Sequence, residues 1–188
     1  MRDSRTAGLV RAALAAALIG VSALVAVPIG PVPVTLQVLA VAVTVLLLSP
    51  RESLAALGTY VALGAIGLPV FSAGSGGVGV LLGPTGGFLV GFVVGAPLGS
   101  LVRTRLSGGP GVHRLGADTL GVAVMVAVSY MLGLVQLTMV TSMTAVEGLG
   151  VAVVPFIVPD AIKVLIALIV TRSVRRASPG VLQAGCCR

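Results

Sequence analysis

The stretch that decides the fold class is residues 151–171, which read VAVVPFIVPDAIKVLIALIVT. It is long enough to cross a bilayer as a helix, because about 20 apolar residues span a hydrocarbon core of roughly 30 Å. Two of its residues, Asp160 and Lys163, carry a charge. The stretch therefore predicts a membrane-spanning helix with one acidic and one basic side chain at membrane depth.

The composition of the whole chain of 188 residues favours the same class. Hydrophobic residues make up 57% of the chain, charged residues make up 9%, and the mean hydropathy is +1.16. A soluble domain carries roughly 25% charged residues, and a disordered chain needs more polarity than this. The apolar runs are also continuous, whereas the strands of a membrane β-barrel alternate in segments of about 10 residues.

Breaks rich in glycine and proline divide the chain into six apolar runs. The runs cover approximately residues 9–27, 34–49, 53–68, 88–102, 118–140 and 151–171. The sequence thus predicts an all-α integral membrane protein with six transmembrane helices. It divides into an N-terminal segment (1–8), a six-helix membrane domain (9–172) and a basic C-terminal tail (173–188).

The positive charges predict the orientation of these spans. If the N-terminus is cytoplasmic, all 11 arginine residues fall on the cytoplasmic side, and Glu147 is the only charge in the three opposite loops. Positive charges concentrate in cytoplasmic loops, so we expect both termini to be cytoplasmic. The net charge of +7 is explained by this topology, and the scarcity of aromatic residues argues against nucleic acid as a partner.

Asp160 and Lys163 are the first candidate functional residues. Lys163 is the only lysine of the chain, and a charge at the centre of a membrane costs about 2.5–3.5 kcal/mol or more. Residues three apart share one face of a helix, and Pro159 favours the first turn of a helix, which would place Asp160 beside its N-terminus. The pair is either a cationic anchor for an anionic substrate, oriented by Asp160, or a mutually neutralising structural pair.

The glycine-dense residues 71–88 are a second candidate region. Gly74, Gly76 and Gly79 match GxGxxG, but the segment lacks the strand and the acidic residue that a dinucleotide site requires. The segment is either a flexible external loop or irregular backbone that folds back to line a cavity, which membranes allow where protein buries it.

Residues 31–37, which read PVPVTLQ, are a third candidate region. Thr35 and Gln37 lie where an extended loop enters the second apolar run, and they either cap a helix or supply neutral hydrogen bonds to a ligand. Tyr60 and Tyr130 lie within apolar runs, and we interpret both as packing residues.

Small residues four apart also recur in the first apolar run, where they permit close contact between helices. The pairs are Ala12/Ala16, Ala13/Ala17 and Ala16/Gly20. In a segment so rich in alanine, such pairs arise readily by chance, so they represent either a composition effect or a docking face for a partner.

Several functions are disfavoured by what the sequence lacks. It has no GxxxxGK[ST] motif for ATP and no HExxH or GxSxG motif, so we expect no catalytic residues. It has no cysteine and histidine spacing typical of a metal site, and we expect neither a metal nor a cofactor. Cys186 and Cys187 are adjacent in the tail, and the sequence does not define their role. A transporter of this kind requires energy from elsewhere or only facilitates diffusion.

Four motifs, in this order along the chain, resemble the BioY family, the biotin-specific substrate-binding (S) components of energy-coupling-factor (ECF) transporters. They are PVPVTLQ (31–37), GAIGLPVF (64–71), GPTGGFLVGF (83–92) and PFIVPDAIK (155–163). The resemblance extends from about Ala12 to Thr171. One departure is Phe88, where the family pattern usually has tyrosine, so a hydroxyl group is lost at that position.

This resemblance implies a six-helix protein in the cell membrane of a bacterium or archaeon, with a biotin site near the extracellular side under the loop between the first two spans. The implied partners are biotin, a transmembrane coupling subunit, a pair of ABC-type ATPases and the lipid bilayer. The implied ligand-binding residues are Thr35, Gln37, Phe71, Ser75, Thr85, Phe88, Asp160 and Lys163. The implied residues for docking on the coupling subunit are Ala12, Ala16 and Gly20.

The chemistry of biotin agrees with this set of residues. Biotin has one carboxylate, a ureido group and an apolar bicyclic body, which require one cation, a few neutral polar groups and apolar walls. Two alternatives remain open: a stand-alone, gradient-driven carrier of biotin or another small monocarboxylate, and a membrane scaffold in which the charged pair is purely structural.

Overall fold

The computed structural model describes residues 2–28, 32–107 and 112–177, and most of them are helical. The elements are α1 (Arg2–Leu24), β1 (Ala26–Val27), β2 (Val34–Thr35), α2 (Gln37–Leu47), α3 (Pro50–Ala65), the 3-10 helix η1 (Ser72–Gly74), α4 (Val78–Leu82), α5 (Gly86–Leu106), α6 (Val112–Thr141), α7 (Ala145–Ala152) and α8 (Val154–Ala177). The six predicted apolar runs correspond mainly to α1, α2, α3, α5, α6 and α8. Cys186 and Cys187 lie outside the described residues.

Two of these six helices are shorter than a membrane span requires, and α2 is also shorter than its predicted run of residues 34–49. Within the described ranges, α1, α5, α6 and α8 are long and apolar enough to cross a membrane. By contrast, α2 has 11 residues and α3 has 16, fewer than the roughly 20 that a span requires. The chain before α2 forms the antiparallel pair β1–β2, in which Ala26 pairs with Thr35. The count of six spans therefore stays a prediction.

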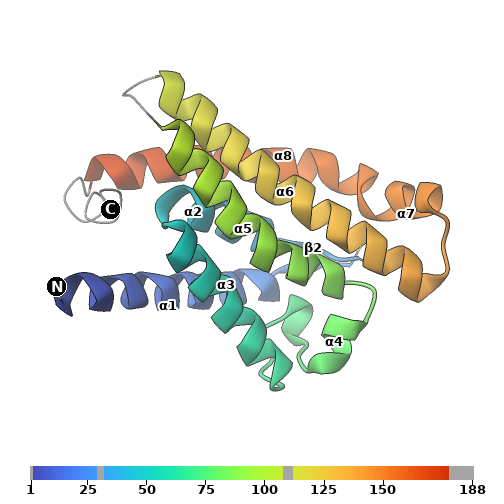
Figure 1. Cartoon of the computed structure of the whole chain (residues 1–188). Coiled ribbons are helices and arrows are strands. Elements are labelled where there is room, and N and C mark those ends of the chain that lie inside the picture. Colours follow the sequence, from blue (N-terminus) through green and yellow to red (C-terminus); the bar gives the residue numbers. More distant parts are fainter. Residues whose placement is uncertain (1, 29–31, 108–111, 178–188) are drawn as a thin grey trace.

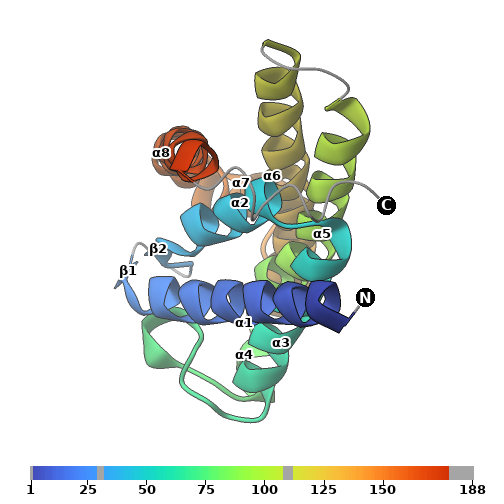
Figure 2. The same cartoon turned by 90° about the vertical axis from the view of Figure 1, so that its left-hand side faces the viewer.

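The helix ends that adjoin the arginine-rich segments lie at the same end of the molecule. In Figure 1 the start of α1, the end of α5, the start of α6 and the end of α8 are all at the left, whereas α4 and α7 are at the right. Figure 2 shows α8 nearly end-on and α5 beside α6. The short α2 contacts α1, α5, α6 and α8, so it lies at the centre of the fold.

Helices α5 and α6 pack backbone to backbone through a row of glycines. These recur every four residues along α5, as Gly87, Gly91, Gly95 and Gly99. A Cβ atom at Gly91 would lie 2.5 Å from Ser129 Cα, and one at Gly99 would lie 2.3 Å from Gly121 O. Glycine at these positions therefore lets the two helices approach closely, as small residues do between membrane helices.

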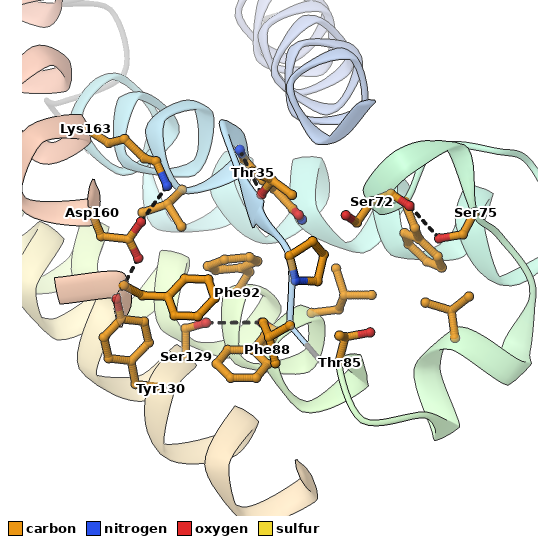
Figure 3. Close-up of a pocket in the computed structure, with 18 residues that line it drawn as sticks. Thr35, Ser72, Ser75, Thr85, Phe88, Phe92, Ser129, Tyr130, Asp160 and Lys163 are labelled. Atoms are coloured by element: carbon orange, nitrogen blue, oxygen red, sulfur yellow. Dashed lines mark hydrogen bonds and ion pairs between the residues drawn. The ribbon is translucent and has the colours of Figure 1, made fainter. Parts of the chain in front are cut away.

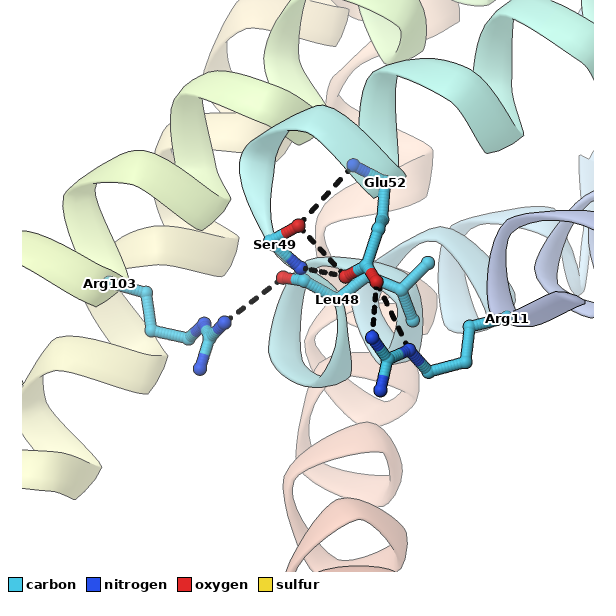
Figure 4. Close-up of polar contacts among 5 residues, drawn as sticks. All are labelled: Arg11, Leu48, Ser49, Glu52 and Arg103. Atoms are coloured by element: carbon cyan, nitrogen blue, oxygen red, sulfur yellow. Dashed lines mark hydrogen bonds and ion pairs between the residues drawn. The ribbon is translucent and has the colours of Figure 1, made fainter. Parts of the chain in front are cut away.

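The C-terminal end of α2 is held by arginine side chains from two other helices. Leu46 O would accept a hydrogen bond from residue 50 if the helix continued, but Pro50 has no N–H. Arg175 of α8 donates to this carbonyl instead. Arg103 of α5 donates from Nη2 to Leu48 O at 3.0 Å (Figure 4). These contacts satisfy backbone carbonyls that the end of a helix leaves without partners.

The start of α3 is fixed to α1 at the same place (Figure 4). Ser49 and Glu52 form a capping box, in which Ser49 N donates to Glu52 Oε2 at 2.9 Å and Glu52 N donates to Ser49 Oγ at 3.4 Å. Arg11 of α1 donates to Glu52 Oε1 from Nη2 at 2.5 Å and from Nε at 3.1 Å. The arginine-rich end of the molecule is thus joined by specific polar contacts.

Candidate ligand-binding site

A cavity lies between α2, α5, α6, α8 and residues 71–85, a segment that contains η1 and α4 (Figure 3). Of the described residues, 18 line it, and most of the lining is apolar, as is usual for sites that bind small molecules. Aromatic rings form much of its wall, and they belong to Phe71, Phe88, Phe92, Tyr130 and Phe156. The polar groups lie at two ends of the cavity, on either side of these rings.

The charged end of the cavity is built by α6 and α8. Lys163 Nζ donates to Asp160 Oδ1 at 2.6 Å, and Tyr130 OH donates to Asp160 Oδ2 at 2.6 Å. The Asp160 and Lys163 side chains are only 5% and 9% exposed. An ammonium has three donors and a carboxylate has about four acceptor sites. The pair can therefore both donate to and accept from one ligand while its internal bond is kept.

The position of Pro159 differs from the sequence prediction. Because α8 begins at Val154, Pro159 lies inside the helix and not in its first turn. The expected placement of Asp160 beside a helix N-terminus is therefore wrong. Pro159 has no N–H for the carbonyl of Pro155, four residues earlier, and the helix nevertheless continues through this point.

The opposite end of the cavity carries hydroxyl groups and no charge (Figure 3). Ser72, Ser75 and Thr85 line it. Ser75 Oγ donates to Ser72 O at 2.8 Å, whereas Ser72 Oγ is buried and has no hydrogen-bond partner among the described residues. A buried polar group without a partner costs roughly 1–3 kcal/mol. A ligand that bonds to this hydroxyl would remove that cost.

The start of α2 contributes neutral polar groups between the two ends. Gln37 N donates to Thr35 Oγ1 at 3.3 Å, so the Thr35 hydroxyl satisfies the first amide of α2 as the capping interpretation expects. Gln37 is buried, and its Nε2 donates to Tyr60 OH at 3.1 Å. Both Thr35 and Gln37 also line the cavity, so the capping role does not remove them from it.

Two of the phenyl rings in the wall lie against glycines. A Cβ atom at Gly64 would lie 2.1 Å from Phe71 Cζ, and one at Gly133 would lie 2.4 Å from Phe88 Cδ1. Phe71 also meets Tyr60 edge to face, with ring centroids 5.5 Å apart. The glycines of α3 and α6 therefore provide the space in which the phenyl walls are fixed.

The eight residues predicted to bind a ligand all line this one cavity, and they are Thr35, Gln37, Phe71, Ser75, Thr85, Phe88, Asp160 and Lys163. Their contact with a ligand stays a prediction. Of the two interpretations of residues 71–88, the structure supports backbone that lines a cavity. Pro31 of the first motif, and with it the centre of the expected capping loop, lies outside the described residues.

Sequence reasoning missed part of the site. The interpretation of Tyr130 as a packing residue is incomplete. Its side chain packs against the core cluster that contains Phe156, but its hydroxyl also bonds to Asp160 and its side chain lines the cavity. Ser72, Ser129 and Phe156 line the cavity as well. The available signal for these residues was a tyrosine or serine within an apolar run. It does not identify a cavity residue, because tyrosine and serine in such runs often only pack against neighbouring helices.

The predicted docking residues of α1 are buried within this chain. Ala12 and Ala16 are 6% and 5% exposed and belong to the core of this chain. A Cβ atom at Gly20, which is also buried, would lie 3.7 Å from Val70 Cβ. These residues pack within the fold, and their contact with a partner stays a prediction. The other small pair of the helix, Ala13 and Ala17, is exposed.

A helical membrane protein that holds a buried ion pair, aromatic walls and one unpaired hydroxyl group around one cavity has the features of a membrane binding protein for a small polar molecule. Residues 1–180 match the BioY family, and the chain belongs to this family. The resemblance in the four motifs is thereby confirmed.

Individual relatives agree over nearly the full length. The chain is 35% identical over 181 residues to the biotin transporter BioY2 of Lactococcus lactis subsp. cremoris (strain MG1363), with 94% of each chain covered. It is 36% identical to the biotin transporter BioY of Thermotoga maritima, covering 89% of this chain and 95% of the relative. A crystal structure of the S-component for biotin from an ECF-type ABC transporter matches with a TM-score of 0.85 and 26% identity over 94% of each chain.

The unpaired hydroxyl of Ser72 leads to a prediction about the ligand-free protein. Ser72→Ala is expected to stabilise it by about 1 kcal/mol, because the substitution removes a buried polar group that has no partner. Thermal unfolding of the purified protein in detergent measures this as a higher melting temperature. The matched control is Ser75→Ala, which removes a donated hydrogen bond and should not stabilise. A melting temperature that falls in Ser72→Ala contradicts the prediction.

Proposed function

We propose that this chain is the biotin-binding S component of an ECF vitamin uptake transporter. It captures biotin from the external side of the cell membrane and transfers it through coupling to separate ATPase subunits. The observation that carries the proposal is the buried Asp160–Lys163 pair, which opens onto an aromatic cavity in a chain of the BioY family. The relatives named above are biotin transporters, which supports biotin as the ligand.

In this proposal each part of biotin has a chemical counterpart in the cavity. Lys163 binds the carboxylate and Asp160 orients the ammonium, while the phenyl rings contact the bicyclic body. Neutral groups such as Gln37, Ser75 and Thr85 bond to the ureido group. The pair also permits the reverse placement, because Asp160 can accept from a ureido N–H and Lys163 can donate to its carbonyl. The contact of Lys163 with Asp160 balances its charge and is compatible with both placements.

Lys163→Ala is expected to weaken biotin binding at least tenfold, which corresponds to about 1.4 kcal/mol. Titration of the purified protein with labelled biotin measures the dissociation constant. Arg172→Ala, which removes an exposed cation from the same helix, is the matched control and should bind as the unaltered protein does. An unchanged dissociation constant in Lys163→Ala would refute the assigned role.

The same titration with biotin amide decides between the two placements of the ligand. If Lys163 binds the carboxylate, biotin amide and Lys163→Ala each remove the same interaction. The two losses of binding free energy are then not additive. Additive losses assign the carboxylate to the hydroxyl end of the cavity and the ureido group to the charged pair.

We further propose six passes with both termini cytoplasmic, and the division into residues 1–8, 9–172 and 173–188. The common position of the arginine-bearing helix ends supports this topology. In a protein without Cys186 and Cys187, Val146→Cys on α7 should react with an impermeant maleimide on intact bacterial cells, because residue 146 is external and 79% exposed. Arg114→Cys, on the opposite side, should react only after lysis. The reverse pattern contradicts the topology.

We place the docking face for a transmembrane coupling subunit at Ala13 and Ala17 of α1. Both are exposed, they are four residues apart, and small pairs of this kind allow close approach of a second membrane helix. This assignment replaces the buried residues of the same helix, and the ABC-type ATPases then act through the coupling subunit.

Replacement of both Ala13 and Ala17 by leucine is expected to abolish co-purification of the coupling subunit and reduce biotin uptake at least tenfold, because the larger side chains keep the helices apart. Biotin binding to the isolated protein should not change. The matched control is replacement of Ala123 and Ala127 of α6, also exposed and four apart, by leucine. Uptake that persists without ATPases and stops with an uncoupler would instead favour a stand-alone carrier.

A further inference from the structure

Residues 71–85 form the uncharged end of the cavity. Phe71 is fully buried and Val80 and Leu81 pack against the core, whereas no residue of 72–85 is itself fully buried. Neither η1 nor α4 contains a buried residue, and α4 has five residues. Val78 and Leu82 are 54% and 71% exposed. Segments with few buried apolar contacts open at low free energy. The position of this wall of the cavity therefore depends on contacts with the helices beside it.

Few hydrogen bonds provide those contacts. One is between backbones, from Gly77 N to Gly64 O at 2.7 Å. Among the residues that the structure describes, Gln136 of α6 is the only side chain outside this segment that hydrogen-bonds to it. Gln136 Nε2 donates to Leu81 O at 2.6 Å and to Gly83 O at 2.8 Å.

The two carbonyls that Gln136 binds are at the C-terminal end of α4, where a helix leaves its last carbonyls without amide partners. The amide reaches them because Gly86 has no side chain. A Cβ atom there would lie 2.6 Å from Gln136 Nε2 and 1.8 Å from Leu81 O. The contact is therefore enclosed by the fold and is not a chance meeting of surface groups.

Helix α6 thus supports both polar ends of the cavity. Tyr130 bonds to Asp160 at the charged end, and Gln136, less than two turns further along α6, holds the segment that carries Ser72, Ser75 and Thr85. Gln136 itself does not line the cavity. Its side chain is in place to fix the wall without contacting a ligand.

We infer that Gln136 is a positioning residue that keeps residues 71–85 closed over the cavity and so controls how fast the ligand binds and leaves. This inference rests on the proposed function for its ligand, biotin. Breaking the two bonds of the Gln136 amide releases the end of α4 and uncovers the hydroxyl end, while the Asp160–Lys163 pair stays in place.

The test is Gln136→Leu, which has a similar volume and no donor. The dissociation rate of labelled biotin from the purified protein is expected to rise at least tenfold, and the association rate should rise as well. The dissociation constant should therefore change less than the dissociation rate does. The matched control is Thr138→Val on the same helix, because the Thr138 hydroxyl bonds only within α6, and its rates should equal those of the unaltered protein.

Hydrogen exchange of the ligand-free protein provides a readout that a general structural role would not produce. In Gln136→Leu the amides of residues 78–85 should exchange faster, while those around Asp160 and Lys163 should not. This measurement needs no ligand, so it tests the inference even if the protein does not bind biotin and the proposed function fails.

An unchanged biotin dissociation rate in a folded Gln136→Leu protein would overturn the inference. Faster exchange spread evenly over α6 and α8 would overturn it as well, because it would indicate a general loosening. If Gln136→Leu does not fold, Gln136→Glu serves as the second variant. Its carboxylate keeps the size of the side chain but has no N–H for Leu81 O and Gly83 O, so it should act in the same direction.

Discussion

A charge in the interior of a membrane has no solvent to stabilise it, and the arrangement of α6 and α8 follows from this constraint. Asp160 is satisfied by Lys163 on its own helix and by Tyr130 from α6. Direct packing between α6 and α8 is otherwise sparse, because α2 lies between them and contacts both. The space beside α2 becomes the cavity, and the charged group that requires partners faces it. Well-packed apolar residues in place of such an ion pair often cost no stability. Stability alone therefore does not explain the pair, and its presence favours a role in binding.

The short α2 connects this cavity to the arginine-rich end of the molecule. Gln37, its first residue, and Thr35, just before it, line the cavity. The carbonyls at its other end accept hydrogen bonds from Arg175 and Arg103. The residues that predict the orientation of the chain in the membrane therefore also complete the hydrogen bonding of its central helix. A helix of 11 residues is stable in this position because both of its ends are bound by other elements.

The sequence predicted the helices and the charged pair because charges, prolines and glycine clusters stand out against apolar runs, whereas the full set of eight cavity residues was implied by the resemblance to the BioY family. The sequence did not predict Tyr130 or Gln136 as supports of the cavity, because their hydrogen-bond partners are 30 or more residues away. A neutral side chain in an apolar run does not indicate which other element it contacts. The length of α2 depends on the tertiary fold, because Val34 and Thr35 pair with β1 and the helix begins only at Gln37. The burial of Ala12 and Ala16 within the chain was not predicted, because small residues serve packing within one chain as well as between chains.

The glycine row between α5 and α6 limits which parts of the protein can move. Helices in direct backbone contact along such a length cannot slide or bend separately without a clash, so the hairpin they form behaves as a single rigid body. A rearrangement that admits a molecule to the interior is therefore expected in the shorter elements attached to this hairpin, and not in the hairpin itself. The hairpin of α5 and α6 thus forms a closely packed frame for the wall of the cavity that residues 71–85 build.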